Sequence, residues 1–173
     1  KNPKSNLANI GLYYIKDYKL MFESINYLIE KDLQTKGEFY LVDAFNLMID
    51  KGTKLKSETV RNWMDCGKPE TLLKTNQYLL KKTPDKKYKN IKSSLIIKPV
   101  FIESGTTIEN CIIGPNVSIS KNTCIKNSII KNSIIGEKSI VEESQIKNSI
   151  IGSFATVKGF YKKLNVGDDS ELV

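Results

Sequence analysis

Histidine is absent from the 173 residues of this chain. Without it the chain cannot form a Ser-His-Asp triad, and it has no imidazole to serve as a general base. A glycine-rich phosphate-binding loop is absent as well. Such a loop supplies the backbone N–H groups that hold a triphosphate, so the sequence predicts no complete nucleotide site.

Arginine is almost absent. Arg61 is the only one, and the net charge of +8 comes from lysines spread over the whole chain. Proteins that read nucleic acids use arginine for bidentate contacts, so we expect a solvated lysine surface and no nucleic-acid partner. No apolar run approaches the length of a membrane span, and we expect no membrane association.

Cysteine is rare too, since Cys66, Cys111 and Cys124 form an odd count without paired spacing. This spacing predicts no disulfide framework and fits a reducing cytoplasm. The first residue is Lys1 rather than methionine, and no charged-then-apolar leader follows it. We therefore expect no targeting segment and a chain cut from a longer protein.

The most regular feature of the sequence is an aliphatic β-branched ladder with a residue at every fifth or sixth position. Its members are Ile96, Ile102, Ile108, Ile113, Ile119, Ile125, Ile130, Ile135, Val141, Ile146, Ile151 and Val157. Two positions earlier stands a second series, small or β-branched and never charged: Val100, Thr106, Cys111, Val117, Thr123, Ser128, Ser133, Ser139, Ser144, Ser149 and Ala155. A period near six predicts short strands joined by corners, as in a hexapeptide β-helix.

The residues between the ladder positions are asparagine, lysine, glutamate, serine and glycine, which suit the solvated outer faces and tight corners of such a β-helix. A β-sandwich is the alternative, but its strands are longer and more widely spaced. The pattern resembles the left-handed hexapeptide β-helix family over nearly half of the chain, and only this resemblance implies the handedness. Val166 and Leu172 predict a last partial rung, and Phe160, Tyr161 and Leu164 are candidates to cap the open end of the bore.

The first 80 residues have an α/β pattern. We expect a buried strand over 8–15, a helix capped by Asp17 and running to about 31, a helix over 41–49 ended by Gly52, a short strand pair near Leu55 and Val60, and a helix that begins at Pro69. This set buries too little surface to make a complete domain. The predicted divisions are an α/β part over 1–80, a linker over 81–92 and the β-helix over 93–173.

Three segments of the α/β part read ANIGLY at 8–13, KGEFYLVDA at 36–44 and WMDCGKPE at 63–70. They resemble motifs of the sugar-nucleotidyltransferases, which are the glucose-1-phosphate thymidylyl- and uridylyltransferases and their relatives. All three occur in the order and at the spacing of that family, whose members often have a C-terminal left-handed β-helix. The implied fold is the C-terminal part of a Rossmann-like nucleotidyltransferase domain followed by a left-handed parallel β-helix.

The resemblance implies a Mg²⁺-dependent enzyme of nucleotide-sugar biosynthesis that joins a nucleoside triphosphate to a sugar 1-phosphate and releases pyrophosphate. It implies that Asp65 is a metal ligand and that Asn9, Gly11 and Glu38 bind the sugar. A hard carboxylate oxygen at Asp65 agrees with the preference of Mg²⁺. The alternative for Asp65 is a structural turn, in which backbone N–H groups near Cys66 satisfy its carboxylate.

The glycine-rich loop, the first metal-binding aspartate and the sugar-phosphate lysine motif of that family are absent from the sequence. We therefore expect the 173 residues alone to be inactive, and we expect a cytoplasmic homo-oligomer. One alternative is a non-catalytic β-helix that oligomerises or regulates a partner. A hexapeptide acyltransferase is a weaker alternative, because such enzymes use a histidine base.

Overall fold

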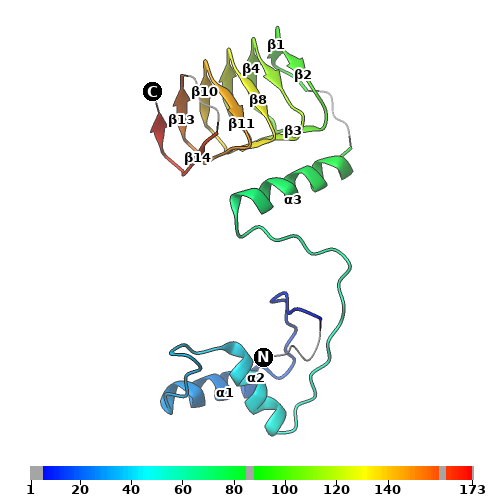
Figure 1. The fold of residues 1–173 in the computed structure, drawn as a ribbon, viewed down its shortest axis with the longest axis vertical. Coiled ribbons are helices and arrows are strands. Elements are labelled where there is room, and N and C mark those ends of the chain that lie inside the picture. Colours follow the sequence, from blue (N-terminus) through cyan, green and yellow to red (C-terminus); the bar gives the residue numbers. More distant parts are fainter. Residues whose placement is uncertain (1–5, 85–87, 160–162, 173) are drawn as a thin grey trace. The chain divides into compact units, whose positions relative to one another are not determined.

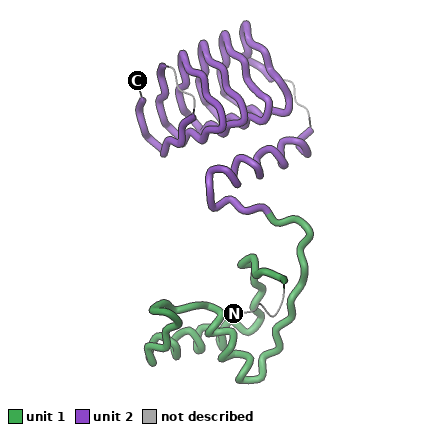
Figure 2. Tube along the Cα trace, viewed as in Figure 1, with its two compact units in different colours: residues 1–63 green, residues 64–173 purple. Residues whose placement is uncertain are grey.

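The computed structural model describes residues 6–84, 88–159 and 163–172. The chain divides into two compact units, Lys1–Trp63 and Met64–Val173 (Figure 2). Helix α3 (Pro69–Lys82) belongs to the second unit with the β-helix, whereas the predicted divisions group it with the α/β part. The predicted linker over 81–92 overlaps the end of α3 and the first strand, β1 (Ile91–Lys92).

The first unit contains two helices that pack against each other, α1 (Tyr18–Glu30) and α2 (Leu41–Asp50). The Asp17 side chain accepts a hydrogen bond from the backbone N–H of Leu20 at 3.1 Å, which confirms the predicted N-cap. After α2 the chain turns at Gly52, whose φ of +92° lies in the left-handed region that glycine adopts without strain. Both helices were predicted from the sequence and are confirmed.

The strands predicted for this unit are not formed. Within residues 6–63 there is no strand, and only an isolated bridge joins Thr35 to Glu38. The predictions of a strand over 8–15 and of a strand pair near Leu55 and Val60 are therefore wrong. A strand needs a neighbouring ladder, and an apolar strand needs cover on both faces. The described part of the unit offers no such ladder, and the Leu12 and Tyr14 side chains are 78% and 93% exposed.

The second unit is a parallel β-helix with three sheets, each named here as a face (Figure 1). Face 1 contains β1, β4 (Thr107–Glu109), β7 (Cys124–Lys126), β10 (Ile140–Glu142), β13 (Thr156–Lys158) and β15 (Glu171–Leu172). Face 2 contains β2 (Leu95–Ile96), β5 (Ile112–Ile113), β8 (Ile129–Lys131) and β11 (Gln145–Lys147). Face 3 contains β3 (Val100–Ile102), β6 (Val117–Ile119), β9 (Ser133–Ile135), β12 (Ile150–Ile151) and β14 (Asn165–Val166). The predicted parallel β-helix is confirmed, and its left hand stays a prediction.

The two side-chain series predicted from the sequence fill the bore. Every ladder position from Ile102 to Val157 is buried, and so is every member of the second series. The strand register places aliphatic residues of successive coils above one another, since Ile108 pairs with Ile125, and Ile125 with Val141. Each coil therefore covers the aliphatic side chains of the coil before it, which is the stabilising contact of a solenoid.

Buried serines of the second series have their hydrogen bonds satisfied inside the bore. The Ser128 hydroxyl donates to the Lys126 carbonyl at 2.6 Å and accepts the N–H of Ser144, one coil later, at 3.1 Å. Ser133 and Ser149 repeat this N–H to hydroxyl bond at 3.2 Å. A small hydroxyl residue at these positions thus connects successive coils without leaving a buried polar group unpaired.

Asparagines occupy many of the corners with left-handed backbone. Asn110, Asn116, Asn122, Asn127, Asn132 and Asn148 all have φ between +47° and +63°. Asparagine tolerates this region better than other residues with a Cβ, so the corner role inferred from composition is confirmed. Their side chains also stack, since Asn110 Nδ2 donates to Asn127 Oδ1 at 2.9 Å.

The last coil forms as predicted. Val166 pairs with Ile151, and Leu172 pairs with Val157. Leu164 packs against the core of the β-helix, as a cap of the bore would. The other two predicted caps, Phe160 and Tyr161, lie outside the described residues.

Candidate functional site

The loop that precedes α3 contains the predicted metal ligand. Pro69 begins the helix, as predicted. The Thr71 hydroxyl accepts the Lys68 N–H at 3.2 Å and donates to the Lys68 carbonyl at 2.9 Å, which closes the loop onto the first turn. Asp65 lies within this loop and is exposed to solvent.

The two carboxylate oxygens of Asp65 have different surroundings. Oδ1 accepts the backbone N–H of Gly67 at 2.9 Å. A Cβ on Gly67 would lie 3.2 Å from that oxygen, so glycine leaves room for the contact. Oδ2 has no hydrogen bond or ion pair within the described residues. The predicted turn is thus present at one oxygen, and the other oxygen remains available to a ligand.

The donors around Asp65 supply only part of what a bound Mg²⁺ requires. Among the described residues, no group of three or more histidine, cysteine or acidic side chains could hold a metal. Mg²⁺ is usually held by one or two carboxylates together with substrate phosphates and water. One exposed carboxylate with a free oxygen fits the protein's share of such a site, and it is too little for a cage made by protein alone.

Asn9 and Gly11 form a local turn in the first unit. Asn9 Oδ1 accepts the N–H of Gly11 at 2.8 Å, and Nδ2 lies 2.6 Å from the Tyr13 hydroxyl. Gly11 has φ of +78°, which favours glycine at this position. Both polar atoms of the Asn9 side chain are therefore engaged within this turn.

Glu38 follows another tight turn. The backbones of Thr35 and Glu38 exchange hydrogen bonds of 2.9 and 3.2 Å. A hydrogen bond from the Tyr40 hydroxyl to Glu38 raises the pKa of Tyr40, and the negative charge of Asp43 adds to the shift. Asp43 lies in the first turn of α2, where a negative charge complements the helix dipole, and it accepts the Thr35 hydroxyl at 2.9 Å.

The predicted site residues are therefore divided between the two units. Asn9, Gly11 and Glu38 belong to the first unit and Asp65 to the second. Each lies in a turn closed by its own short-range hydrogen bonds. Trp63, the first residue of the motif at 63–70, is exposed.

Sequence reasoning missed the attachment of α3 to the β-helix. The Ser118 hydroxyl donates to Asn76 Oδ1 at 2.6 Å, and Gln77 Nε2 donates to Asn132 Oδ1 at 2.5 Å. Helix α3 contacts strands β6 and β9 of face 3. The available signal was a pair of amides, Asn76 and Gln77, between the buried positions Leu73 and Leu80.

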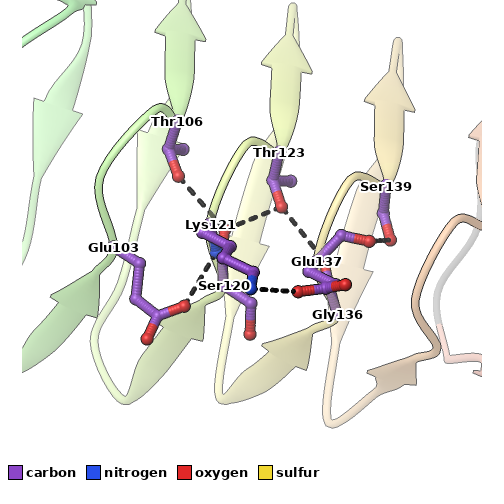
Figure 3. Close-up of polar contacts among 8 residues, drawn as sticks. All are labelled: Glu103, Thr106, Ser120, Lys121, Thr123, Gly136, Glu137 and Ser139. Carbon is purple, nitrogen blue, oxygen red and sulfur yellow. Dashed lines mark hydrogen bonds and ion pairs between the residues drawn. The ribbon is translucent and has the colours of Figure 1, made fainter.

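A groove of about 560 Å³ lies at the first coil, next to a charged cluster. Glu103 accepts the backbone N–H of Lys121 at 2.8 Å, and the Lys121 ammonium lies 3.1 Å from Glu137 (Figure 3). Behind them, the Thr123 hydroxyl lies within hydrogen-bond distance of the Ser120 and Gly136 carbonyls. These groups join neighbouring coils, so we assign the cluster to coil stacking.

No family model matches the chain. Curated proteins do match parts of it. The bifunctional protein GlmU of Methanocaldococcus jannaschii is 40% identical over 111 residues, which are 61% of this chain and 25% of that protein. The bifunctional sugar-1-phosphate nucleotidylyltransferase/acetyltransferase of Sulfurisphaera tokodaii is 36% identical over 78 residues, 45% of this chain and 18% of that protein.

A third relative matches a larger share of the chain. Glucose-1-phosphate thymidylyltransferase of Streptomyces griseus is 27% identical over 145 residues, 73% of this chain and 39% of that protein. The chain thus spans between about a fifth and two fifths of the length of these relatives. The resemblance to sugar-1-phosphate nucleotidyltransferases that the motifs indicate is confirmed. Among the described residues, no helix is long and apolar enough to cross a membrane.

Proposed function

We propose that this chain is part of a cytoplasmic sugar-1-phosphate nucleotidyltransferase, which forms an NDP-sugar and pyrophosphate from a nucleoside triphosphate and a sugar 1-phosphate. Two relatives support the reaction class through their names, the sugar-1-phosphate nucleotidylyltransferase/acetyltransferase and the glucose-1-phosphate thymidylyltransferase. The observation that carries the proposal is the half-occupied carboxylate of Asp65, within the motif that resembles the metal-binding segment of these enzymes.

Asp65 is the proposed Mg²⁺ ligand, through its free Oδ2. Mg²⁺ bound there would neutralise negative charge on the substrate phosphates. The Gly67 N–H would hold the carboxylate in one orientation, so that little conformational entropy is lost when the ion binds. Asn9, Gly11 and Glu38 are the proposed sugar contacts, because amide, carboxylate and exposed backbone groups are suitable partners for sugar hydroxyls.

The 173 residues alone are proposed to be inactive. They include no glycine-rich loop to hold the triphosphate, and in our proposal that loop belongs to the remainder of the protein. The expected result is no Mg²⁺-dependent pyrophosphate release by the purified chain with any nucleoside triphosphate and sugar 1-phosphate. Measurable release would contradict this part of the proposal.

The experiment that tests the metal role replaces Asp65 in the full-length protein. Asp65→Asn keeps an oxygen that can accept the Gly67 N–H, but it removes the charge that Mg²⁺ requires. Turnover should fall by roughly a hundredfold or more, as when a transition-state electrostatic contact is lost, while the melting temperature barely changes. Asp65→Ala is the control for the turn, since it also loses the bond to Gly67 and should lower the melting temperature. An active Asp65→Asn enzyme would end the metal assignment.

A homo-oligomer built on the β-helix is the second proposal, and it applies with or without catalysis. Face 2 presents a row of exposed aliphatic side chains in register, Leu95, Ile112 and Ile129. The corresponding surface of face 1 has a row of alternating charge, Lys92, Glu109, Lys126, Glu142 and Lys158. Face 3 is in contact with α3. The apolar row on face 2 is therefore the surface that best fits a second copy of the chain.

Two isoleucines of equal exposure provide the test of this surface. Ile112 on face 2 and Ile140 on face 1 are both 38% exposed. Ile112→Lys should shift the mass measured by light scattering toward the monomer, whereas Ile140→Lys should leave the mass unchanged. Equal effects, or a parent protein that is already monomeric, would contradict the proposal. Acetyl transfer appears in the name of the Sulfurisphaera tokodaii relative, but these 173 residues supply no histidine base for it.

A further inference from the structure

Helix α3 is held against the β-helix at its centre and near its N-terminus. At the centre, Ser118 and Asn132 of the β-helix hold Asn76 and Gln77 through hydrogen bonds of 2.6 and 2.5 Å. Asn132 Nδ2 in turn donates to Asn148 Oδ1 of the next coil at 2.6 Å. The amide of Gln77 is therefore the first member of a row that continues along the corner of the β-helix.

Packing and charge add to these bonds. Leu73 and Leu80 lie seven residues apart on one face of α3, and both are buried. Near the N-terminus of the helix, Glu70 lies 3.7 Å from Lys163, which belongs to the penultimate coil. That pair is exposed and contributes little by itself, but it lies one turn from the loop that contains Asp65.

The same helix holds the main chain of Asp65. The Thr75 hydroxyl, which is buried, donates to the Asp65 carbonyl at 3.4 Å. Thr75 directly precedes Asn76, so a shift of the helix against face 3 would also shift this bond. Asp65 Oδ1 is fixed to Gly67, and the loop is closed by Thr71. The chain of contacts from face 3 through α3 to Asp65 is continuous.

We propose that the β-helix sets the position of Asp65 through α3, with Asn76, Gln77 and Ser118 as positioning residues. None of them touches substrate in this proposal. They fix the helix that directly follows the loop at 64–68, and so they determine where the free Oδ2 of Asp65 lies. The inference rests on the proposed function, in which that oxygen binds Mg²⁺. Under it, the β-helix takes part in catalysis without contributing a residue to the active site.

The test uses the full-length enzyme with the double change Gln77→Ala and Ser118→Ala, which removes both central bonds. We expect kcat to fall by roughly tenfold and the Mg²⁺ concentration for half-maximal rate to rise several-fold, because small misplacements of a catalytic group have effects of this size. The KM for the sugar 1-phosphate should stay the same. Lys74→Ala, on the exposed side of α3, is the matched control and should change none of these values.

A conservative variant separates positioning from stability. Ser118→Thr keeps the hydroxyl that donates to Asn76 and should retain the parental kcat and Mg²⁺ dependence. If the double variant melts at a lower temperature but has parental kinetics at low temperature, the positioning role is refuted. Asp65→Asn, measured in parallel, distinguishes a failure of the positioning role from a failure of the proposed function. Loss of activity there with parental kinetics in the double variant would refute only the positioning role, whereas retained activity would refute the proposed function.

Discussion

The same substitution at two isoleucines measures how much of the stability of the β-helix comes from its bore. Ile119 points inward and is fully buried, whereas Ile140 lies on the outer surface of face 1 and is 38% exposed. Both lie in strands of the parallel β-helix, so replacing either with alanine changes strand propensity by a similar amount. Ile140 also lies outside the proposed oligomer surface on face 2, so the difference between Ile119→Ala and Ile140→Ala isolates burial.

The structure gives the size of that difference. Ile119→Ala removes three buried carbons, about 2 kcal/mol of transfer free energy. The cavity cannot close easily, because the adjoining coils are held by the bonds from Glu103 N–H to the Ile119 carbonyl and from Ser120 N–H to the Ile135 carbonyl, both 3.0 Å. With the cavity included, we expect a loss of about 3–4 kcal/mol. Ile140→Ala loses only part of its burial and leaves no cavity, so about 1 kcal/mol is expected.

Urea unfolding of the 173-residue chain, followed by circular dichroism, provides the measurement. If the m value is unchanged, the shift in midpoint gives the loss in unfolding free energy directly. The expected gap between the two variants is about 2–3 kcal/mol. Equal losses would show that the ladder side chains are not packed in a closed bore, and they would refute the register described above.

Three further predictions concern the interior of the β-helix. Thr123→Val removes a hydroxyl whose single proton lies within hydrogen-bond distance of two carbonyls, and it should cost about 1–2 kcal/mol in urea unfolding, whereas Thr107→Val, on the exposed side of face 1, should cost less than half of that. Gly152→Ala would bring a Cβ to 2.4 Å from the backbone of the next coil and should prevent or strongly destabilise folding, while Gly167→Ala, with its nearest atom at 4.0 Å, should melt like the parent. Burial raises the pKa of the Cys111 thiol, so its contribution to stability is complete at neutral pH and is lost as the pH rises above about 8.5. The urea midpoint of the parent should accordingly fall more steeply in alkali than that of Cys111→Ala, and parallel curves would contradict the assignment.

The β-helix could be predicted because its pattern is complete within the sequence. Each coil repeats the same inward positions, so the pattern predicts that Ile108, Ile125 and Val141 stack, without knowledge of any distant segment. The corners were predictable for a related reason, since asparagine is one of the few residues with a Cβ that adopts left-handed backbone readily. The handedness of the β-helix has no such local signal, and its prediction depended only on the resemblance to the left-handed hexapeptide family.

The strands expected in the first unit show the opposite case. The segment over 8–15 is apolar enough for a buried strand, but a strand is completed by its neighbours, and the described chain supplies none. The helices α1 and α2 depend on local caps and on each other, and both were predicted correctly. For the candidate site, the sequence identified residues whose turns are local, such as Asn9 with Gly11 and Asp65 with Gly67. Their joint arrangement depends on contacts over long distances, which no local pattern encodes.

Asn132 shows why the attachment of α3 was hidden in the sequence. Its backbone has φ of +47°, so the sequence explains it completely as a corner residue. Its side chain meanwhile accepts a hydrogen bond from Gln77 and donates one to Asn148, which connects the corner to the helix. Glycine would satisfy the backbone at this position at least as well, but it would break the row of amides at the point where α3 is held. The asparagine corners are therefore not equivalent. Where a helix lies against the β-helix, the corner residue serves both conformation and docking, and only the second role explains why an amide is needed.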